Sequence, residues 1–125
     1  MAHTKTALVV DDSSVMREMV AQTLRKAGFE LRLGSNGQEG LDRLTAAPVD
    51  LIVTDVYMPV MDGISFVRAV RARPDGHKVP ILILTTETKA EIKQQGKAAG
   101  ASGWIVKPFN PEMLDRKSTR LNSSH

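Results

Sequence analysis

The stretch LIVTDVYMPVMDG (residues 51–63) places an apolar run directly before a carboxylate, Asp55. The run Leu51–Thr54 is almost continuously apolar, which is typical of a strand covered on both faces of a parallel sheet. A Met-Pro pair and then Asp62 and Gly63 follow, and Asp-Gly pairs favour tight turns. The sequence therefore predicts a buried strand that ends on an acidic side chain, followed by a loop of defined shape.

Four further segments have strand character, and helical periodicity fills the gaps between them. The first and fourth strands are as apolar as the third, whereas the second alternates and suits an edge strand. Strands that alternate with helices predict an α/β domain with a five-stranded parallel sheet, right-handed crossovers and helices on both faces. The four additional strands are predicted at Thr6–Val10, Phe29–Leu33, Ile81–Thr85 and Gly103–Val106.

Apolar residues at helical spacing predict a helix after each of the first three strands. The first helix contains Met16 and Met19, which we expect in the core, and ends at Gly28. The second begins with a capping pair, Asn36 and Glu39. The third carries the apolar stripe Phe66, Val67 and Val70.

A fourth helix is predicted to open with a capping box, Thr88 to Glu91. Its sequence, KAEIKQQGKAAG, has few apolar residues and contains Gly96, a poor helix former. We therefore expect this helix to pack weakly and to be an element that moves.

The last eleven residues, DRKSTRLNSSH (115–125), break the pattern of the chain. NPEML (110–114) begins a capped helix, but Leu121 is the one apolar residue after it. Because all eleven residues match the in-frame translation of a common sequencing adapter, we interpret them as a read-through tail, with a natural disordered tail as the alternative. The domain is then residues 1–114 with a truncated last helix. Losing several buried side chains at ~1.5–3 kcal/mol each should make it unstable or aggregation-prone.

Composition excludes several classes of protein. The 125 residues are enough for one core, and there is no cysteine for disulfides or thiolate chemistry. The three histidines lack zinc-ligand spacing, and no apolar stretch reaches the ~20 residues of a membrane span. The excess positive charge lies largely in the tail, so the domain has no basic stripe for nucleic acid. We expect a monomeric cytoplasmic protein.

Polar side chains follow the strands at one predicted edge of the sheet. Asp11 and Asp12 close the first strand and Asp55 the third, while Thr85 ends the fourth and Lys107 follows the fifth. In open parallel sheets ligands bind beyond the carboxyl ends of the strands, so these side chains should converge. A single aspartate there is more often a helix cap. Three together repel one another unless a cation joins them, and all-oxygen ligation suits Mg²⁺.

The motifs VVDDSSVMR, DVYMPVMDG, LTTE and GWIVKPFNPE resemble the receiver domain of two-component response regulators, over Thr4 to Leu114. The last motif, with GKAAGASG before it, resembles single-domain chemotaxis regulators of the CheY type. The resemblance implies a flavodoxin-like, doubly wound fold with strand order 2-1-3-4-5. It implies a phosphorelay in which Asp55 accepts a phosphoryl group from a sensor histidine kinase. The implied Mg²⁺ ligands are Asp11, Asp12, Asp55 and the backbone carbonyl of Tyr57.

The resemblance also implies a switch. The Thr85 hydroxyl and the Lys107 ammonium would contact the phosphoryl group, and Pro108 would follow a cis peptide bond. Trp104 would turn inward when Thr85 moves, although it is equally compatible with a half-buried packing residue. Because Tyr57 is bulkier than several family members carry at its position, we hypothesise that it limits access of the hydrolytic water.

The implied partners are a CheA-like histidine kinase and a downstream effector such as the flagellar motor switch. Such a protein is not an enzyme with a separate substrate, although it promotes its own phosphorylation and dephosphorylation. Two alternatives differ in class. One is the receiver module of a longer transcriptional regulator. The other is a Mg²⁺-dependent phosphohydrolase, which is disfavoured because no cap-like insertion offers a substrate pocket.

Overall fold

The computed structural model describes residues 4–76 and 78–123, and within them five strands form one parallel sheet. The strand order is β2-β1-β3-β4-β5, as the resemblance implied, and the doubly wound α/β fold is confirmed. The strands are β1 (Thr6–Val10), β2 (Glu30–Gly34), β3 (Leu51–Thr54), β4 (Ile81–Thr85) and β5 (Gly103–Val106).

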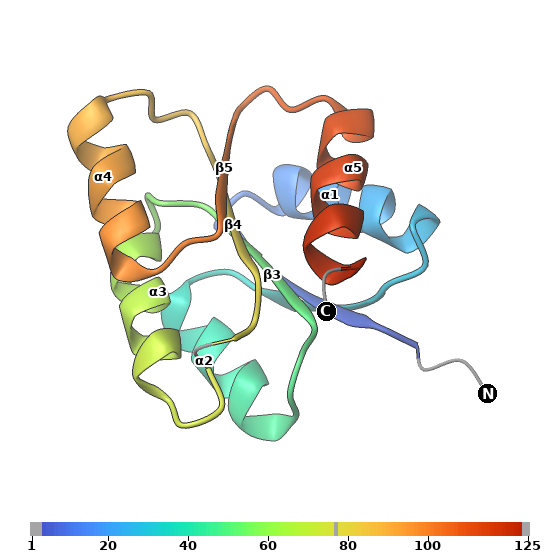
Figure 1. The fold of residues 1–125 in the computed structure, drawn as a ribbon, viewed down its shortest axis with the longest axis horizontal. Coiled ribbons are helices and arrows are strands. Elements are labelled where there is room, and N and C mark those ends of the chain that lie inside the picture. The colour runs from blue at the N-terminus through green and yellow to red at the C-terminus, as the bar shows by residue number, and fades with distance from the viewer. Residues whose placement is uncertain (1–3, 77, 124–125) are drawn as a thin grey trace.

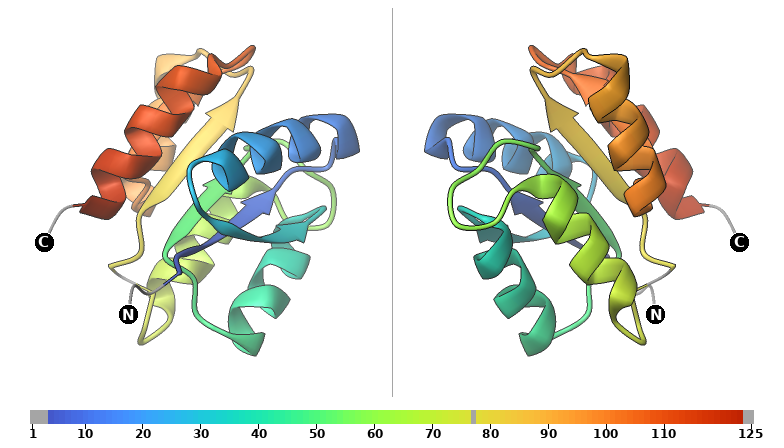
Figure 2. Two further views of the ribbon diagram at one scale, coloured as in Figure 1. Left: turned by 90° about the vertical axis from the view of Figure 1, so that its right-hand side faces the viewer. Right: turned by 90° about the vertical axis from the view of Figure 1, so that its left-hand side faces the viewer.

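Helices cover both faces of this sheet (Figures 1 and 2). One face carries α1 and α5, which lie side by side, and the other carries α2, α3 and α4. The helices are α1 (Ser14–Lys26), α2 (Gly37–Ala46), α3 (Gly63–Ala72), α4 (Ala90–Ala99) and α5 (Pro111–Ser123).

The alternation of side chains along the central strands builds a separate core on each face of the sheet. In β1, Leu8 and Val10 belong to the core beneath α2, α3 and α4, whereas Ala7 and Val9 belong to the core beneath α1 and α5. Successive side chains of a strand point to opposite faces, so a strand covered on both sides must be apolar throughout. This explains why the apolar runs in the sequence located the central strands correctly.

The second strand begins one residue later than predicted. Phe29 is buried, but its backbone N–H donates to the Leu24 carbonyl (3.0 Å) and so belongs to the end of α1. Gly28, with φ +99°, makes this helix ending possible because glycine adopts positive φ without a Cβ clash. The pairing with β1 therefore starts at Glu30, opposite Thr6.

Two local predictions about helices are wrong. Met19 lies on the outer side of α1 with 49% of its surface exposed, because the buried stripe runs through Val20, Ala21 and Leu24. The capping box at Thr88 does not form, since α4 begins after Lys89 and the described residues show no side-chain cap there. The predicted pair at α2 is confirmed, because the Asn36 side chain accepts a hydrogen bond from the Glu39 N–H at 2.9 Å.

The sequence predicted that the last helix is truncated after Leu114. In the structure, α5 continues through the tail to Ser123. Leu114 and Ser118 are fully buried, and the partly buried Leu121 packs against the core beneath α1 and α5. The spacing of four and then three residues puts these side chains on one helical face. The tail therefore supplies a buried stripe despite its polar composition, and the predicted instability stays a prediction. Within the described residues, none of the helices combines the length and apolarity needed to span a bilayer.

Candidate functional site

Three acidic side chains meet at the carboxyl edge of the sheet, as predicted. Asp11 and Asp12 follow β1, and Asp55 follows β3, which pairs directly with β1. Each offers a carboxylate oxygen, and these oxygens lie within 4.8 Å of one another. Asp11 and Asp55 are buried, whereas Asp12 is exposed to solvent. Three oxygens at this spacing, open on one side, fit a hard divalent cation such as Mg²⁺ that retains some of its water.

The Lys107 ammonium lies between two of these carboxylates. Its Nζ is 2.9 Å from Asp11 Oδ2 and 2.9 Å from Asp55 Oδ2. The peptide bond from Lys107 to Pro108 is cis, as the resemblance implied. The Lys107 backbone N–H donates to the Thr85 carbonyl (2.8 Å), so the last residue of β4 and the residue after β5 are held together. The structure thus brings the predicted lysine into direct contact with the predicted acids.

Burial and the contacts of Lys107 with the two acids act in opposite directions on the pKa values of this cluster. Burial raises the pKa of the Asp11 carboxyl, against the opposing effect of the Lys107 hydrogen bond. Burial alone would lower the pKa of Lys107, but its hydrogen bonds to Asp55 and Asp11 outweigh this, and the pKa of Lys107 is raised. The ammonium form is therefore retained, and a cation binding at Asp11 must compete with Lys107.

Backbone contacts hold the buried acids in position. Asp11 Oδ1 accepts a hydrogen bond from the Ser13 N–H (2.9 Å), and Asp55 Oδ1 accepts one from the Val56 N–H (2.6 Å). Arg17 donates from Nη1 to the Asp11 carbonyl at 2.6 Å. One oxygen of each acid is thereby fixed by the backbone, and the other faces Lys107.

The loop after Asp55 has a shape that requires glycine at its end. A Cβ on Gly63 would lie 1.8 Å from the Asp55 carbonyl oxygen, which is closer than real atoms approach. The Gly63 N–H also donates to the Val56 carbonyl (2.7 Å), and Asp62 caps α3 by accepting from the Ser65 N–H (2.8 Å). The predicted turn is therefore also the device that brings α3 against the strand that carries Asp55.

Glu87, which the sequence analysis did not single out, connects the remaining predicted residues. Its side chain accepts a hydrogen bond from the Tyr57 hydroxyl, and its backbone carbonyl accepts one from Trp104 Nε1 (3.3 Å). Its N–H donates to the hydroxyl of the buried Thr85 (3.4 Å). The signal in the sequence was the acid in the LTTE motif, two residues after Thr85.

The contact between Tyr57 and Glu87 changes the acidity of both groups. The hydrogen bond lowers the pKa of Glu87 and raises the pKa of Tyr57. Burial and the charges of Glu87 and Asp55 add to the rise at Tyr57.

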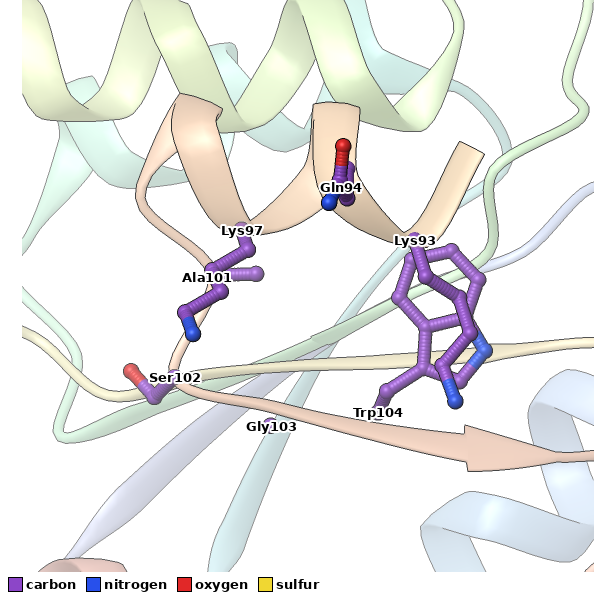
Figure 3. Close-up of a pocket in the computed structure, with 7 residues that line it drawn as sticks. All are labelled: Lys93, Gln94, Lys97, Ala101, Ser102, Gly103 and Trp104. Carbon is purple, nitrogen blue, oxygen red and sulfur yellow. The ribbon is translucent and has the colours of Figure 1, made fainter. Parts of the chain in front are cut away.

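A pocket of about 260 Å³ lies between α4 and β5, beside Trp104 (Figure 3). Its floor is largely apolar, and Lys93 and Lys97 of α4 border it. Trp104 is half-buried, and a Cβ on Gly96 of α4 would lie 2.8 Å from the Trp104 ring. The indole therefore packs beneath α4 while its N–H contacts the loop that follows β4.

Comparison with known proteins gives a consistent result. The family described as "Response regulator receiver domain" matches residues 7–118. Chemotaxis protein CheY-3 of Vibrio cholerae is 39% identical over 120 residues, which cover 91% of this chain and 88% of the relative. Chemotaxis protein CheY1 of Helicobacter pylori is 42% identical over 113 residues, which cover 88% and 90%.

Solved structures are similar over the whole fold. The chemotaxis response regulator CheY4 of Vibrio cholerae superposes with a TM-score of 0.89 at 49% identity, covering 95% of this chain and 99% of the other. The receiver domain of a sensor histidine kinase from Pseudomonas aeruginosa gives a TM-score of 0.90 at 29% identity, covering 98% and 100%. That structure is described with a magnesium ion coordinated in its active-site cleft.

Proposed function

The chain belongs to the response regulator receiver domain family, and from this membership we propose that it is a phosphorylation-controlled switch in chemotaxis. It takes a phosphoryl group onto Asp55 from a phosphohistidine of a CheA-like histidine kinase. The observation that supports this most directly is the cluster at the sheet edge. Lys107 joins the buried Asp11 and Asp55, and Asp12 completes a group of three carboxylates that would hold a divalent cation.

Phosphoryl transfer requires an ionised nucleophile and positive charge around the moving group. A carboxylate oxygen of Asp55 attacks phosphorus, the P–N bond to the donor imidazole breaks, and a P–O bond forms as neutral histidine leaves. Lys107 would bind the phosphoryl oxygens, a role supported by the contact of its ammonium with Asp55. Asp11, Asp12 and Asp55 would hold Mg²⁺, with the Tyr57 carbonyl as the further ligand that the resemblance implies. The bound ion would supply positive charge near the phosphoryl oxygens.

The protein would act on no separate substrate. Its chemistry is limited to gaining and losing its own phosphoryl group, and its output is a changed surface. Movement of the Thr85 hydroxyl toward the phosphoryl group would alter the contacts of Glu87 and so of Trp104. The pocket between α4 and β5 lies beside that indole and is the proposed surface for an effector such as the flagellar motor switch. The protein would work as a monomer in the cytoplasm, without nucleic acid.

The test is incubation of the purified protein with Mg²⁺ and acetyl phosphate, followed by intact-mass measurement and Trp104 fluorescence. We expect a mass gain of one phosphoryl group and a change in emission, both of which disappear in Asp55→Asn and on removal of Mg²⁺ by a chelator. Trp104 is the single tryptophan, so the emission reports on this site alone. A protein that stays unmodified, or that is modified equally in Asp55→Asn, would refute the assignment.

A further inference from the structure

The loop between β4 and α4 is fastened through one side chain. Glu87 Oε1 accepts from the Tyr57 hydroxyl, which belongs to the loop after Asp55. Glu87 Oε2 accepts from the backbone N–H groups of Thr88 (2.9 Å) and Lys89 (3.0 Å), immediately before α4. A single carboxylate therefore bridges the loop that follows the phosphorylation site and the beginning of α4.

The backbone of the same residue contacts both proposed switch side chains. The Glu87 N–H donates to Thr85 Oγ1 (3.4 Å), and the Glu87 carbonyl accepts from Trp104 Nε1 (3.3 Å). Any displacement of Glu87 must therefore change the surroundings of Thr85 and of Trp104 together.

Few side-chain contacts hold helix α4 in place. The residue before it, Lys89, supplies no side-chain cap among the described residues. The Glu87 carboxylate binds the backbone N–H groups of Thr88 and Lys89, which lead into the first turn of α4. Two residues of α4, Gly96 and Ala99, are buried, so few apolar contacts hold it to the sheet. The beginning of α4 can consequently follow Glu87 when Glu87 moves.

We propose that Glu87 is a positioning residue that couples the charge at Asp55 to α4 and Trp104, with Tyr57 as its tether. The inference rests on the proposed function, because it assumes that Asp55 is phosphorylated. Phosphorylation adds negative charge at Asp55, two residues before Tyr57 and so on the Tyr57 side of the bridge. Repulsion between the phosphoryl group and the Glu87 carboxylate weakens the bridge. By linkage, a bridge that phosphorylation weakens must itself oppose phosphorylation.

The test compares Tyr57→Phe and Glu87→Gln in the full chain, titrated with beryllofluoride and Mg²⁺ and followed by Trp104 emission. Tyr57→Phe keeps the ring and removes the hydrogen-bond donor. Glu87→Gln keeps the shape and removes the charge. We expect both variants to reach half-saturation at lower beryllofluoride concentration, by about threefold to tenfold, which is the range typical of coupling between sites. The larger effect should belong to Glu87→Gln, because it removes the repelling charge itself.

Glu91→Gln is the matched control, because it removes the same charge from the exposed first turn of α4. It should titrate like the wild type. The double variant should gain no more than Glu87→Gln alone, because both changes act through one bond. Since the substitutions can alter the emission of Trp104 directly, occupancy is also measured as the phosphorylated fraction at a fixed acetyl phosphate concentration, by intact mass.

The outcomes separate the two proposals. A wild-type protein that neither responds to beryllofluoride nor gains a phosphoryl group would refute the proposed function. A wild-type protein that responds, with Tyr57→Phe and Glu87→Gln titrating like Glu91→Gln or more weakly than it, would overturn the positioning role and leave the proposed function intact.

Discussion

Helices α3 and α4 have the same length, ten residues, and cover the same face of the sheet, but different contacts hold them. α3 is anchored by apolar side chains that include the fully buried Phe66, Val67 and Val70. α4 buries Gly96 and Ala99, which have little or no side chain to anchor it. The free energy of apolar burial scales with the area removed from water, so α3 is held far more strongly than α4.

Polar contacts at its two ends hold α4 instead. The Glu87 carboxylate binds the N–H groups before its first turn, and the Arg71 guanidinium binds the Gly100 carbonyl after its last turn at 3.0 and 2.8 Å. Hydrogen bonds of this kind contribute little net free energy each and can be exchanged, whereas a packed core does not deform gradually. Helix α3 is therefore a fixed element that supports the loop carrying the site, whereas α4 is suited to rearrangement.

The largest effect is expected from removing the anchor of α3. Phe66→Ala should lower the free energy of unfolding by about 3–5 kcal/mol, the usual cost of deleting a buried phenylalanine side chain. Ile92→Ala, at a partly buried position of α4, should cost less than about 1.5 kcal/mol, because its side chain is already partly in water. Urea denaturation measures both. Equal losses would contradict the claim that the two helices are held differently.

A smaller effect is expected at the far end of α4. Arg71 also donates from Nη1 to the Gly76 carbonyl (2.7 Å) and the Val79 carbonyl (2.6 Å), and burial lowers the pKa of its guanidinium. Arg71→Met should lower the free energy of unfolding by about 1.5–3 kcal/mol, the range for hydrogen bonds to a charged group, and should speed amide exchange in α4 more than in α3.

Arg73→Met is the control for that substitution. Arg73 forms an ion pair with the exposed Asp75 (3.3 Å), and exposed pairs contribute less than about 1 kcal/mol. Exchange measured by mass spectrometry should leave α4 unchanged in this variant. If Arg71→Met accelerated exchange in α3 and α4 to the same extent, the guanidinium would be a general support of the fold and no specific anchor of α4.

The sequence could predict the residues that a local pattern marks, but not those whose partners lie far away in the chain. Asp11, Asp55 and Lys107 were located because an apolar run marks each strand and parallel strands end at one edge, so short-range pattern and topology sufficed. Glu87 and Arg71 were missed because their partners, Tyr57 and Gly100, lie 30 and 29 residues away and no local pattern records them.

The wrong predictions also have a common cause. The sequence around Thr88 fits a capping box, but the backbone N–H groups of Thr88 and Lys89 are bound by Glu87, whose carboxylate also binds Tyr57, 30 residues away. In α5, polar composition predicted an ending at Leu114, whereas the spacing of Ser118 and Leu121 continues a buried face. Local propensity is a weak guide where long-range contacts decide the structure.

The smallest change in stability, and the most selective probe of α4, is expected for Gly96→Ala. Alanine is favoured over glycine inside a helix by about 1 kcal/mol. The added Cβ, however, would lie 2.8 Å from Trp104 Cζ3 and 2.9 Å from Ile83 Cδ1, so α4 or the indole must shift. Because a weakly packed helix can yield, we expect the two effects nearly to cancel, with a change below about 1 kcal/mol in the free energy of unfolding. Trp104 emission should nevertheless shift.

Gln95→Ala, at the exposed neighbouring position, shortens a side chain to the same methyl group without that contact and should leave the emission unchanged. If Gly96→Ala instead cost as much as Phe66→Ala, α4 would be packed as rigidly as α3 and could not respond to Glu87. If its emission matched the wild type, Trp104 would not report on α4. The comparison therefore depends on this variant being nearly neutral in stability and visible in fluorescence, because that combination requires a helix that moves together with the indole beneath it.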